Sequence, residues 1–170
     1  MSHKCLSFFQ EGARRFEKAM KGIPDRVPVC AQMHEFAMQE IGATATEFYT
    51  TPGMLTTATL EIQEKYGIDV PVLDYDVYNI EAEAIGQKMN YSPTNMPDVD
   101  RAKPLIRDRD DLQFIRTPNF DSDGRFRHVI EMNRLFRQQI GGETEITMRF
   151  CAPFSLAANK IGRASCRERV

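Results

Sequence analysis

Apolar residues recur at spacings of three and four over residues 6–20, a pattern that predicts an amphipathic helix. The glycine at position 22 predicts the end of this helix. The apolar stripe consists of Leu6, Phe9, Ala13, Phe16 and Met20. The chain is therefore expected to open with a helix that buries one face.

A second helix is predicted over residues 51–66, with the clearest end signals in the chain. Thr51 is a suitable N-cap, Pro52 suits the first helical position, and Gly67 suits the position after the helix. Its expected inner face consists of Leu55, Ala58, Ile62 and Tyr66.

Three short apolar runs predict strands at residues 27–32, 68–76 and 146–151. The first is rich in valine, and Pro28 lies near its start, where a strand can lack an amide donor. The second ends in acidic and aromatic residues, and the third alternates polar and apolar residues. Each run follows a predicted helix or its connecting turn.

The pattern loosens between residues 87 and 118, which contain four prolines and the charged run at 107–111. We expect a small strand at 88–91, an exposed loop and a short helix at 110–115. A long helix should follow, capped by Asp121 or Ser122 and closed by the glycine pair at 141–142. Its expected inner face includes Phe126, Ile130, Phe136 and Ile140.

The alternation of helices and strands predicts an α/β fold with parallel strands and crossover helices. Three strand and helix units are too few to close a barrel, which needs eight units and roughly 250 residues. The chain is therefore either a small open sheet or the N-terminal part of a truncated (β/α)8 TIM barrel, and its last ten residues favour the second.

Residues 161–170, IGRASCRERV, break the apolar pattern of the helix that Pro153 opens, because they bring three arginines and no aliphatic stripe. The same ten residues are the translation of a DNA string that resembles a sequencing adapter. We therefore interpret residues 161–170 as not native and residues 1–160 as the native portion. A natural basic tail is the alternative.

Composition excludes several classes of partner. The formal net charge is -2, and without the last ten residues it becomes 19 basic minus 23 acidic residues, about -4. This charge is too mild and mixed to predict binding to nucleic acid or to an acidic membrane. We find no membrane span and no signal peptide, and the scattered cysteines, without a CxxC pair, fit a reducing compartment. A cytoplasmic location is expected.

Four segments, in order, resemble the N-terminal portion of the uroporphyrinogen decarboxylase family, whose members are (β/α)8 barrels. They are RFEKAMKGIPDRVPV at 15–29, KYGIDVPVLDYDVYNIEAEAIG at 65–86, DSDGRFRHVIEMNRLFRQQIGGE at 121–143 and CAPFSLAANK at 151–160. In the last, Ala152 stands where the family's turn usually has glycine. Together the four segments cover nearly all of residues 10–160.

The resemblance implies one of two chemistries. Uroporphyrinogen decarboxylases release carbon dioxide in tetrapyrrole biosynthesis without a cofactor, and they bind carboxylates with arginines. The cobamide-dependent methyltransferase branch transfers a methyl group from a corrinoid to a thiol that is bound to zinc. Residues 32–40, QMHEFAMQE, contain no arginine where the decarboxylase has its anion clamp. The sequence Glu-Ala-Glu-Ala at 81–84 also resembles the methyltransferase branch more than the decarboxylase.

We therefore expect a fragment of a methyltransferase, with uroporphyrinogen III decarboxylase and a small non-catalytic α/β binding module as alternatives. The zinc ligands of the branch come from the second half of its barrel, so no metal ligand is assigned in this chain. Zinc and a corrinoid, carried by a corrinoid protein, are expected only for the full-length enzyme. The chain alone should be inactive and prone to self-association, because an incomplete barrel exposes strand edges and apolar faces.

In such barrels the active site lies where the strands end at their C-terminal face. This rule selects His34, which could shuttle a proton or donate a hydrogen bond to a substrate carboxylate. It also selects Asp76, which by resemblance lies nearest to the position of the decarboxylase aspartate. It also selects Asp74, Arg149 and Cys151 as residues that contact a small-molecule substrate. Structural alternatives exist for each: a capping or surface histidine, acidic loop caps, a salt bridge inside the barrel, and a small core residue for Cys151 as for Cys30.

Overall fold

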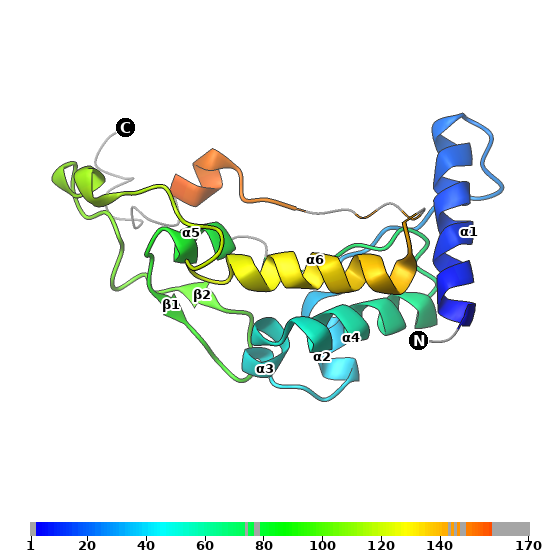
Figure 1. The fold of residues 1–170 in the computed structure, drawn as a ribbon, viewed down its shortest axis with the longest axis horizontal. Coiled ribbons are helices and arrows are strands. Elements are labelled where there is room, and N and C mark those ends of the chain that lie inside the picture. Colours follow the sequence, from blue (N-terminus) through cyan, green and yellow to red (C-terminus); the bar gives the residue numbers. More distant parts are fainter. Residues whose placement is uncertain are drawn as a thin grey trace.

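The computed structural model describes residues 3–73, 75–76, 79–142, 144, 146 and 149–157. Helices dominate the described residues (Figure 1). They are α1 (His3–Met20), α2 (His34–Glu40), α3 (Ala45–Thr50), α4 (Pro52–Lys65), α5 (Ile80–Ala84), the 3-10 helix η1 (Asp110–Phe114) and α6 (Phe126–Ile140). Residues 153–157 are also helical. The two strands are β1 (Met89–Asn90) and β2 (Asp98–Val99), paired antiparallel.

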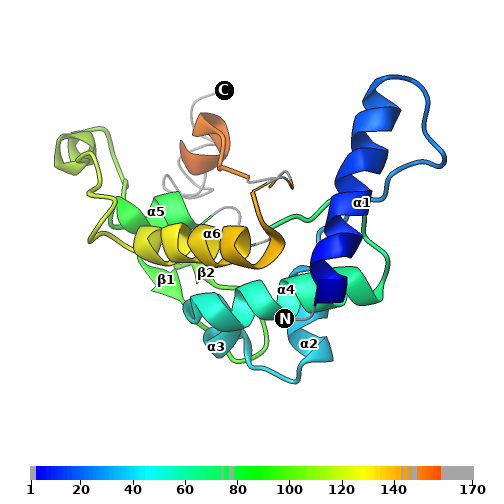
Figure 2. The same cartoon turned by 45° about the vertical axis from the view of Figure 1, so that its right-hand side comes forward.

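The hydrophobic core lies between α4 and α6, with α2, α3 and the N-terminal part of α1 around it (Figures 1 and 2). The fully buried large side chains include Phe9 of α1, Phe48 of α3, Leu55 and Leu60 of α4 and Phe136 of α6. A hydrogen bond of 3.5 Å from the Thr56 hydroxyl to the Met132 carbonyl also joins α4 to α6. The long predicted helices therefore form and bury apolar side chains, whereas the short helix predicted at 110–115 is the 3-10 helix η1, which has no buried residue.

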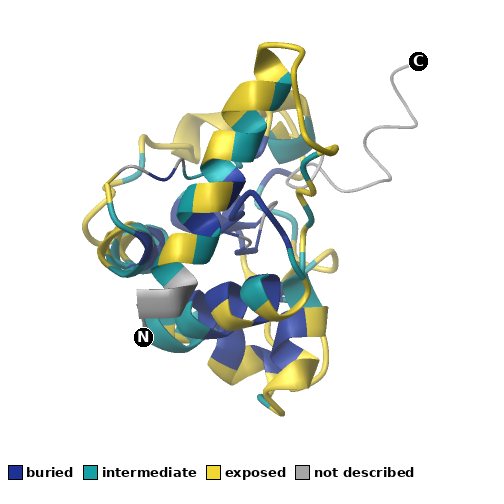
Figure 3. Cartoon of the chain, turned by 90° about the vertical axis from the view of Figure 1, so that its right-hand side faces the viewer, coloured by how far each residue is buried: buried dark blue, intermediate teal, exposed yellow. Residues whose placement is uncertain are grey.

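The predicted inner faces are wrong at their ends. Met20 and Tyr66 lie at the last turn or cap of their helices, where the chain leaves the core, and they are 75% and 47% exposed. Ile130 of α6 is 54% exposed because the buried stripe runs one position earlier, through Val129, Met132, Phe136 and Ile140. The exposed end of α1 and the turn that follows it are visible in Figure 3.

The start of α6 also differs from the prediction. Neither Asp121 nor Ser122 caps it, because α6 begins at Phe126 with Arg125 as the N-cap and no capping side chain. The helix ends at Gly141, as predicted, with a φ of +80°. Asp123 instead closes a turn, accepting hydrogen bonds from Arg116 and from the Asn119 N–H.

Within the part of the chain that the structure describes, the predicted strands at 27–32, 68–76 and 146–151 do not form strands, although Val72 in the second makes an isolated β-bridge. The first two runs touch through one backbone hydrogen bond, from the Val70 N–H to the Val29 carbonyl at 3.1 Å. Val72 is satisfied by a side chain, since its N–H and carbonyl both bond to Gln63 of α4. A ladder needs successive backbone bonds, and one bond does not make a strand.

The helices and the extended runs nevertheless follow one another along the chain in the predicted order. Residues after α4 and residues after α6 both run back toward α5, and in both views α6 lies between α4 and residues 149–157 (Figures 1 and 2). The described residues thus form a partial, mostly helical α/β unit. No helix among them is long and apolar enough to cross a membrane.

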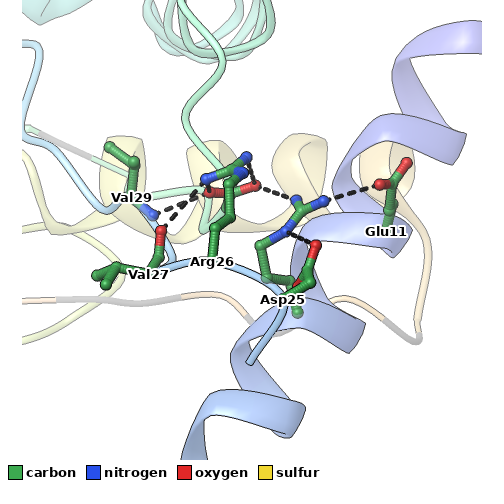
Figure 4. A network of polar contacts seen from close by, with 7 residues as sticks. Glu11, Asp25, Arg26, Val27 and Val29 are labelled. Carbon is green, nitrogen blue, oxygen red and sulfur yellow. Dashed lines mark hydrogen bonds and ion pairs between the residues drawn. The ribbon is translucent and has the colours of Figure 1, made fainter. Parts of the chain in front are cut away.

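An ionic cluster around Asp69 joins α1, the Asp-Arg turn and the second extended run (Figure 4). The Asp69 carboxylate is fully buried and accepts hydrogen bonds from Arg15, from two nitrogens of Arg26 and from the Val29 N–H. Burial alone would raise the pKa of Asp69, but these donors lower it below its usual value. The family-like Asp25-Arg26 turn therefore stabilises the entry to the first two runs.

Candidate functional site

The candidate site is the set of residues that follow the three extended runs, and we call it the rim. It comprises residues 32–40 after the first run, 75–84 after the second and 149–157 after the third. The last two parts are in contact: the Tyr75 hydroxyl donates to the Arg149 carbonyl, and the Cys151 N–H donates to Oε1 of Glu81 at 2.9 Å. The structure thus brings together the neighbourhoods of Asp76, Arg149 and Cys151.

Asp76 lies in a buried polar cluster and is fully inaccessible to solvent. Its Oδ2 accepts from Nη2 of Arg125 at 2.6 Å, and its Oδ1 accepts from Nδ2 of Asn79 at 2.6 Å. Burial raises the pKa of Asp76, and Arg125 and Asn79 oppose this shift. Both oxygens of Asp76 are therefore engaged by the protein itself.

Arg125 is the centre of this cluster, and its side chain is only 4% exposed. Its Nε donates to Glu83 at 2.5 Å, and its guanidinium lies 5.3 Å from the centre of the Tyr91 ring. Tyr91 in turn donates to Glu83 at 2.8 Å. One arginine is thus shared by two carboxylates and one aromatic ring, which ties α5, the residue after β1 and the start of α6 together.

Gly124 allows this arrangement because it lies against the backbone of α5. Its φ is +54°, and a Cβ there would come within 2.9 Å of the Ala84 nitrogen. A residue with a side chain would therefore displace Arg125 from Asp76 and Glu83. Sequence reasoning missed Arg125, which is 49 positions away from Asp76 and carries no local motif.

Tyr75 and Glu81 form the contact between the second and third parts of the rim. Burial, followed by the negative charge of Glu81, raises the pKa of Tyr75 to about 12. The Cys151 side chain is buried, as expected of a small core residue. Cys30, which we predicted to be buried in the same way, is exposed because the first run lacks strand neighbours in the described residues.

Arg149 contributes its backbone carbonyl to Tyr75, and the residue is partly exposed. Phe150 beside it is 71% exposed. The predicted alternation of faces thus places an apolar side chain in solvent at this end of the third run. Asp74 lies outside the described residues.

His34 is the first residue of α2, which packs on α3 and α4. Its φ is +27°, and it is the only non-glycine residue with a positive φ among those described. Positive φ is uncommon for residues with a side chain, although histidine tolerates it better than most. Strain of this kind is found more often at functional sites than elsewhere, and whether His34 belongs to such a site stays a prediction.

The described residues do not fit a metal site. No three His, Cys, Asp or Glu side chains gather closely enough among them to hold a metal ion. Asp76, Glu81 and Glu83 instead bond to Arg125, Asn79, Tyr91 and the Cys151 N–H, and Glu40 bonds to Lys65.

Two comparisons with known proteins are informative. The family model for uroporphyrinogen decarboxylase matches residues 12–167. Among solved structures, the chain is similar to a methyltransferase from Methanosarcina mazei, with 24% sequence identity and a TM-score of 0.75. This similarity covers 92% of the chain and 47% of the methyltransferase, so the chain spans about half of that protein's length. A search of curated proteins gives no match.

The family model covers most of the chain and includes both the ionic cluster around Asp69 and the rim. The structural likeness shows the fold independently of the motifs. The chain belongs to the uroporphyrinogen decarboxylase family.

Proposed function

We propose that the chain is the N-terminal half of a (β/α)8 barrel enzyme that transfers a methyl group from a corrinoid to a thiol. The similarity to a methyltransferase of about twice the length supports this proposal. The three extended runs would then become adjacent parallel strands when the rest of the barrel pairs with them. The chain by itself would be inactive.

The observation that carries the proposal is the acidic character of the rim. Residues 32–40 contain two glutamates and no arginine or lysine. In the second part of the rim, Asp76 and Glu83 already share Arg125, which lies outside the rim at the start of α6. A tetrapyrrole with many carboxylates would meet negative charge here, and each missing charge-assisted contact would cost about 1.5 to 3 kcal/mol.

Methyl transfer to a thiol needs different help from the protein. The thiol must lose its proton, because the thiolate is the nucleophile. A corrinoid would supply the methyl group: the sulfur would form a bond to the methyl carbon, and the electron pair of the broken carbon–cobalt bond would stay on the corrinoid. A corrinoid protein would present the methyl donor, and zinc, held outside this chain, would bind the thiol.

The predicted site residues have roles in this proposal. His34, with its strained backbone, would move a proton between the site and solvent. Asp76 would fix the loop after the second strand through Arg125. Asp74, Arg149 and Cys151 would line the substrate side of the rim. Arg149 is also the observation that favours the second candidate, uroporphyrinogen decarboxylation, since the residue is partly exposed and a guanidinium can bind a carboxylate.

The test is a pair of assays on the full-length enzyme. Methylcobalamin with an alkyl thiol and zinc would be followed by visible absorption, and uroporphyrinogen III would be followed by product chromatography. We expect thiol-dependent loss of the methyl group from cobalt and unchanged uroporphyrinogen. Decarboxylation without demethylation would overturn the proposal and favour the second candidate.

A further inference from the structure

A cavity lies outside the rim, over the first turns of α6. Its volume is about 780 Å3, which is within the range of roughly 300 to 1,000 Å3 that is typical of small-molecule sites. Pro52 at the start of α4 and Ile130, which is 54% exposed, give the cavity an apolar wall. The other residues that line it are polar or charged: Asp121 before α6, and Arg127, His128 and Glu131 on α6.

Two opposite charges of this cavity are unpaired. The Arg127 guanidinium is exposed and makes no hydrogen bond or ion pair to the described residues. The Asp121 carboxylate is also exposed and has no partner among those residues, although its backbone N–H donates to Asn119 at 2.9 Å. Both residues line the same cavity, yet they do not pair with each other. A cation and an anion are therefore both available to a ligand.

The two remaining polar residues add a hydrogen-bond donor and little charge. Both oxygens of Glu131 accept from Arg134, at 2.8 and 2.6 Å, so an arginine already balances this carboxylate. Nδ1 of His128 is shielded and has no partner among the described residues. Because a shielded donor without an acceptor is rarer than a shielded acceptor without a donor, we assign the proton of the neutral ring to Nε2. His128 can then donate from Nε2 to a ligand in the cavity.

We propose that this cavity binds a small zwitterion of the amino-acid type. Its carboxylate would accept from Arg127 and His128, and its ammonium group would donate to Asp121. A ligand with only a negative charge would leave Asp121 unpaired beside it, and a ligand with only a positive charge would leave Arg127 unpaired. Pro52 and Ile130 would contact the carbon chain between the two charges. This site goes beyond the methyl transfer proposed above, because it shares no residue with the rim.

The test is calorimetric titration of the full-length enzyme at pH 7 with glycine, 4-aminobutyrate and 6-aminohexanoate, which differ in the spacing of their charges. Butyrate and butylammonium carry one charge each on a chain of similar length. Arg127→Gln and Asp121→Asn each remove one charge from the cavity. Arg109→Gln and Asp110→Asn are the matched controls, because both residues are exposed at η1 and neither lines the cavity. All four variants should melt within a few degrees of the wild type.

We expect one of the three amino acids to bind with a millimolar Kd, and butyrate and butylammonium to bind about 5-fold more weakly, as for loss of one solvent-exposed ion pair. Arg127→Gln and Asp121→Asn should each weaken binding of that amino acid about 5-fold, and both controls should bind it as the wild type does. In NMR spectra of enzyme with labelled histidine, the ligand should shift the ring signals of His128 and not those of His34. Binding of none of the amino acids, equal binding of the singly charged compounds, or unchanged binding by both cavity variants would overturn the inference.

Discussion

Replacing Asp69 with asparagine should destabilise the protein strongly, because the substitution removes a buried charge from between two arginines. The wild-type carboxylate accepts from Nη1 of Arg15 at 2.5 Å, from Nη1 and Nη2 of Arg26 at 2.6 and 2.7 Å, and from the Val29 N–H at 2.9 Å. Asparagine keeps one acceptor oxygen but turns an NH2 group toward an arginine.

The expected loss can be worked out from the exposure of the partners. Breaking a buried ion pair costs about 3 to 5 kcal/mol. The Arg26 side chain is 47% exposed, so water replaces part of its interaction, whereas the Arg15 side chain is only 12% exposed. We therefore expect the lower end of the range, about 3 kcal/mol. With a slope of about 2 kcal/mol per molar urea, the midpoint should fall by about 1.5 M.

The assay is urea denaturation followed by far-UV circular dichroism at pH 7. Asp25→Asn is the matched control, because Asp25 bonds to the same Arg15 but its side chain is 52% exposed. Its midpoint should stay close to that of the wild type. Equal midpoints for Asp69→Asn and the wild type would refute the idea that this cluster holds the first two runs in place.

Three further predictions concern single positions. His34→Asn, which tolerates positive φ but carries no titratable group, should lower kcat of the full-length enzyme about 100-fold without lowering its melting temperature; unchanged kcat would remove His34 from the site. Gly12→Ala should lower the free energy of unfolding in urea by about 3 kcal/mol, because its Cβ would lie 2.0 Å from the Asp69 carbonyl oxygen. Gly53→Ala, with open space around it, should raise that free energy by about 0.5 to 1 kcal/mol. The reverse order would contradict the packing of α1 on residue 69. Hydrogen bonding to Arg116 lowers the pKa of Asp123 to about 2. The contribution of the ionised Asp123 to stability is therefore present above about pH 4 and is lost as the pH falls through 2. In acid unfolding experiments, the difference in stability between the wild type and Asp123→Asn should shrink over that interval.

The sequence predicted the helices well where local signals were strong. α4 begins with Pro52, and Thr51 holds the N-cap position as predicted, although its side chain makes no capping hydrogen bond; both signals depend only on neighbouring residues. α3 has an equally local signal that sequence reasoning overlooked: Thr44 and Glu47 form a capping box with reciprocal hydrogen bonds. The start of α6 was harder to predict, because Arg125 at its N-cap position makes no capping hydrogen bond and bonds instead to carboxylates that are distant in the sequence.

The extended runs and the rim could not be predicted from periodicity, because they depend on contacts between residues that are distant in the sequence. Residues 27–32 have the composition of a strand, but strand formation needs a partner with successive backbone bonds. Among the described residues, the Val70 N–H supplies the one backbone bond between this run and the second. The sequence selected Asp76 by its position after a run, and it could not reveal that Arg125 and Asn79 occupy both oxygens. Glu81 was interpreted as a loop residue for the same reason: its contact is with Cys151, 70 positions later.

The most direct test of the central claim is an experimental structure of the full-length enzyme. We expect residues 27–32, 68–73 and 149–151 to be adjacent parallel strands of one barrel, with His34, Asp76 and Glu81 at the same end of it. Loops after the three runs that open on different sides of the molecule would contradict both the barrel and the site proposed on its rim.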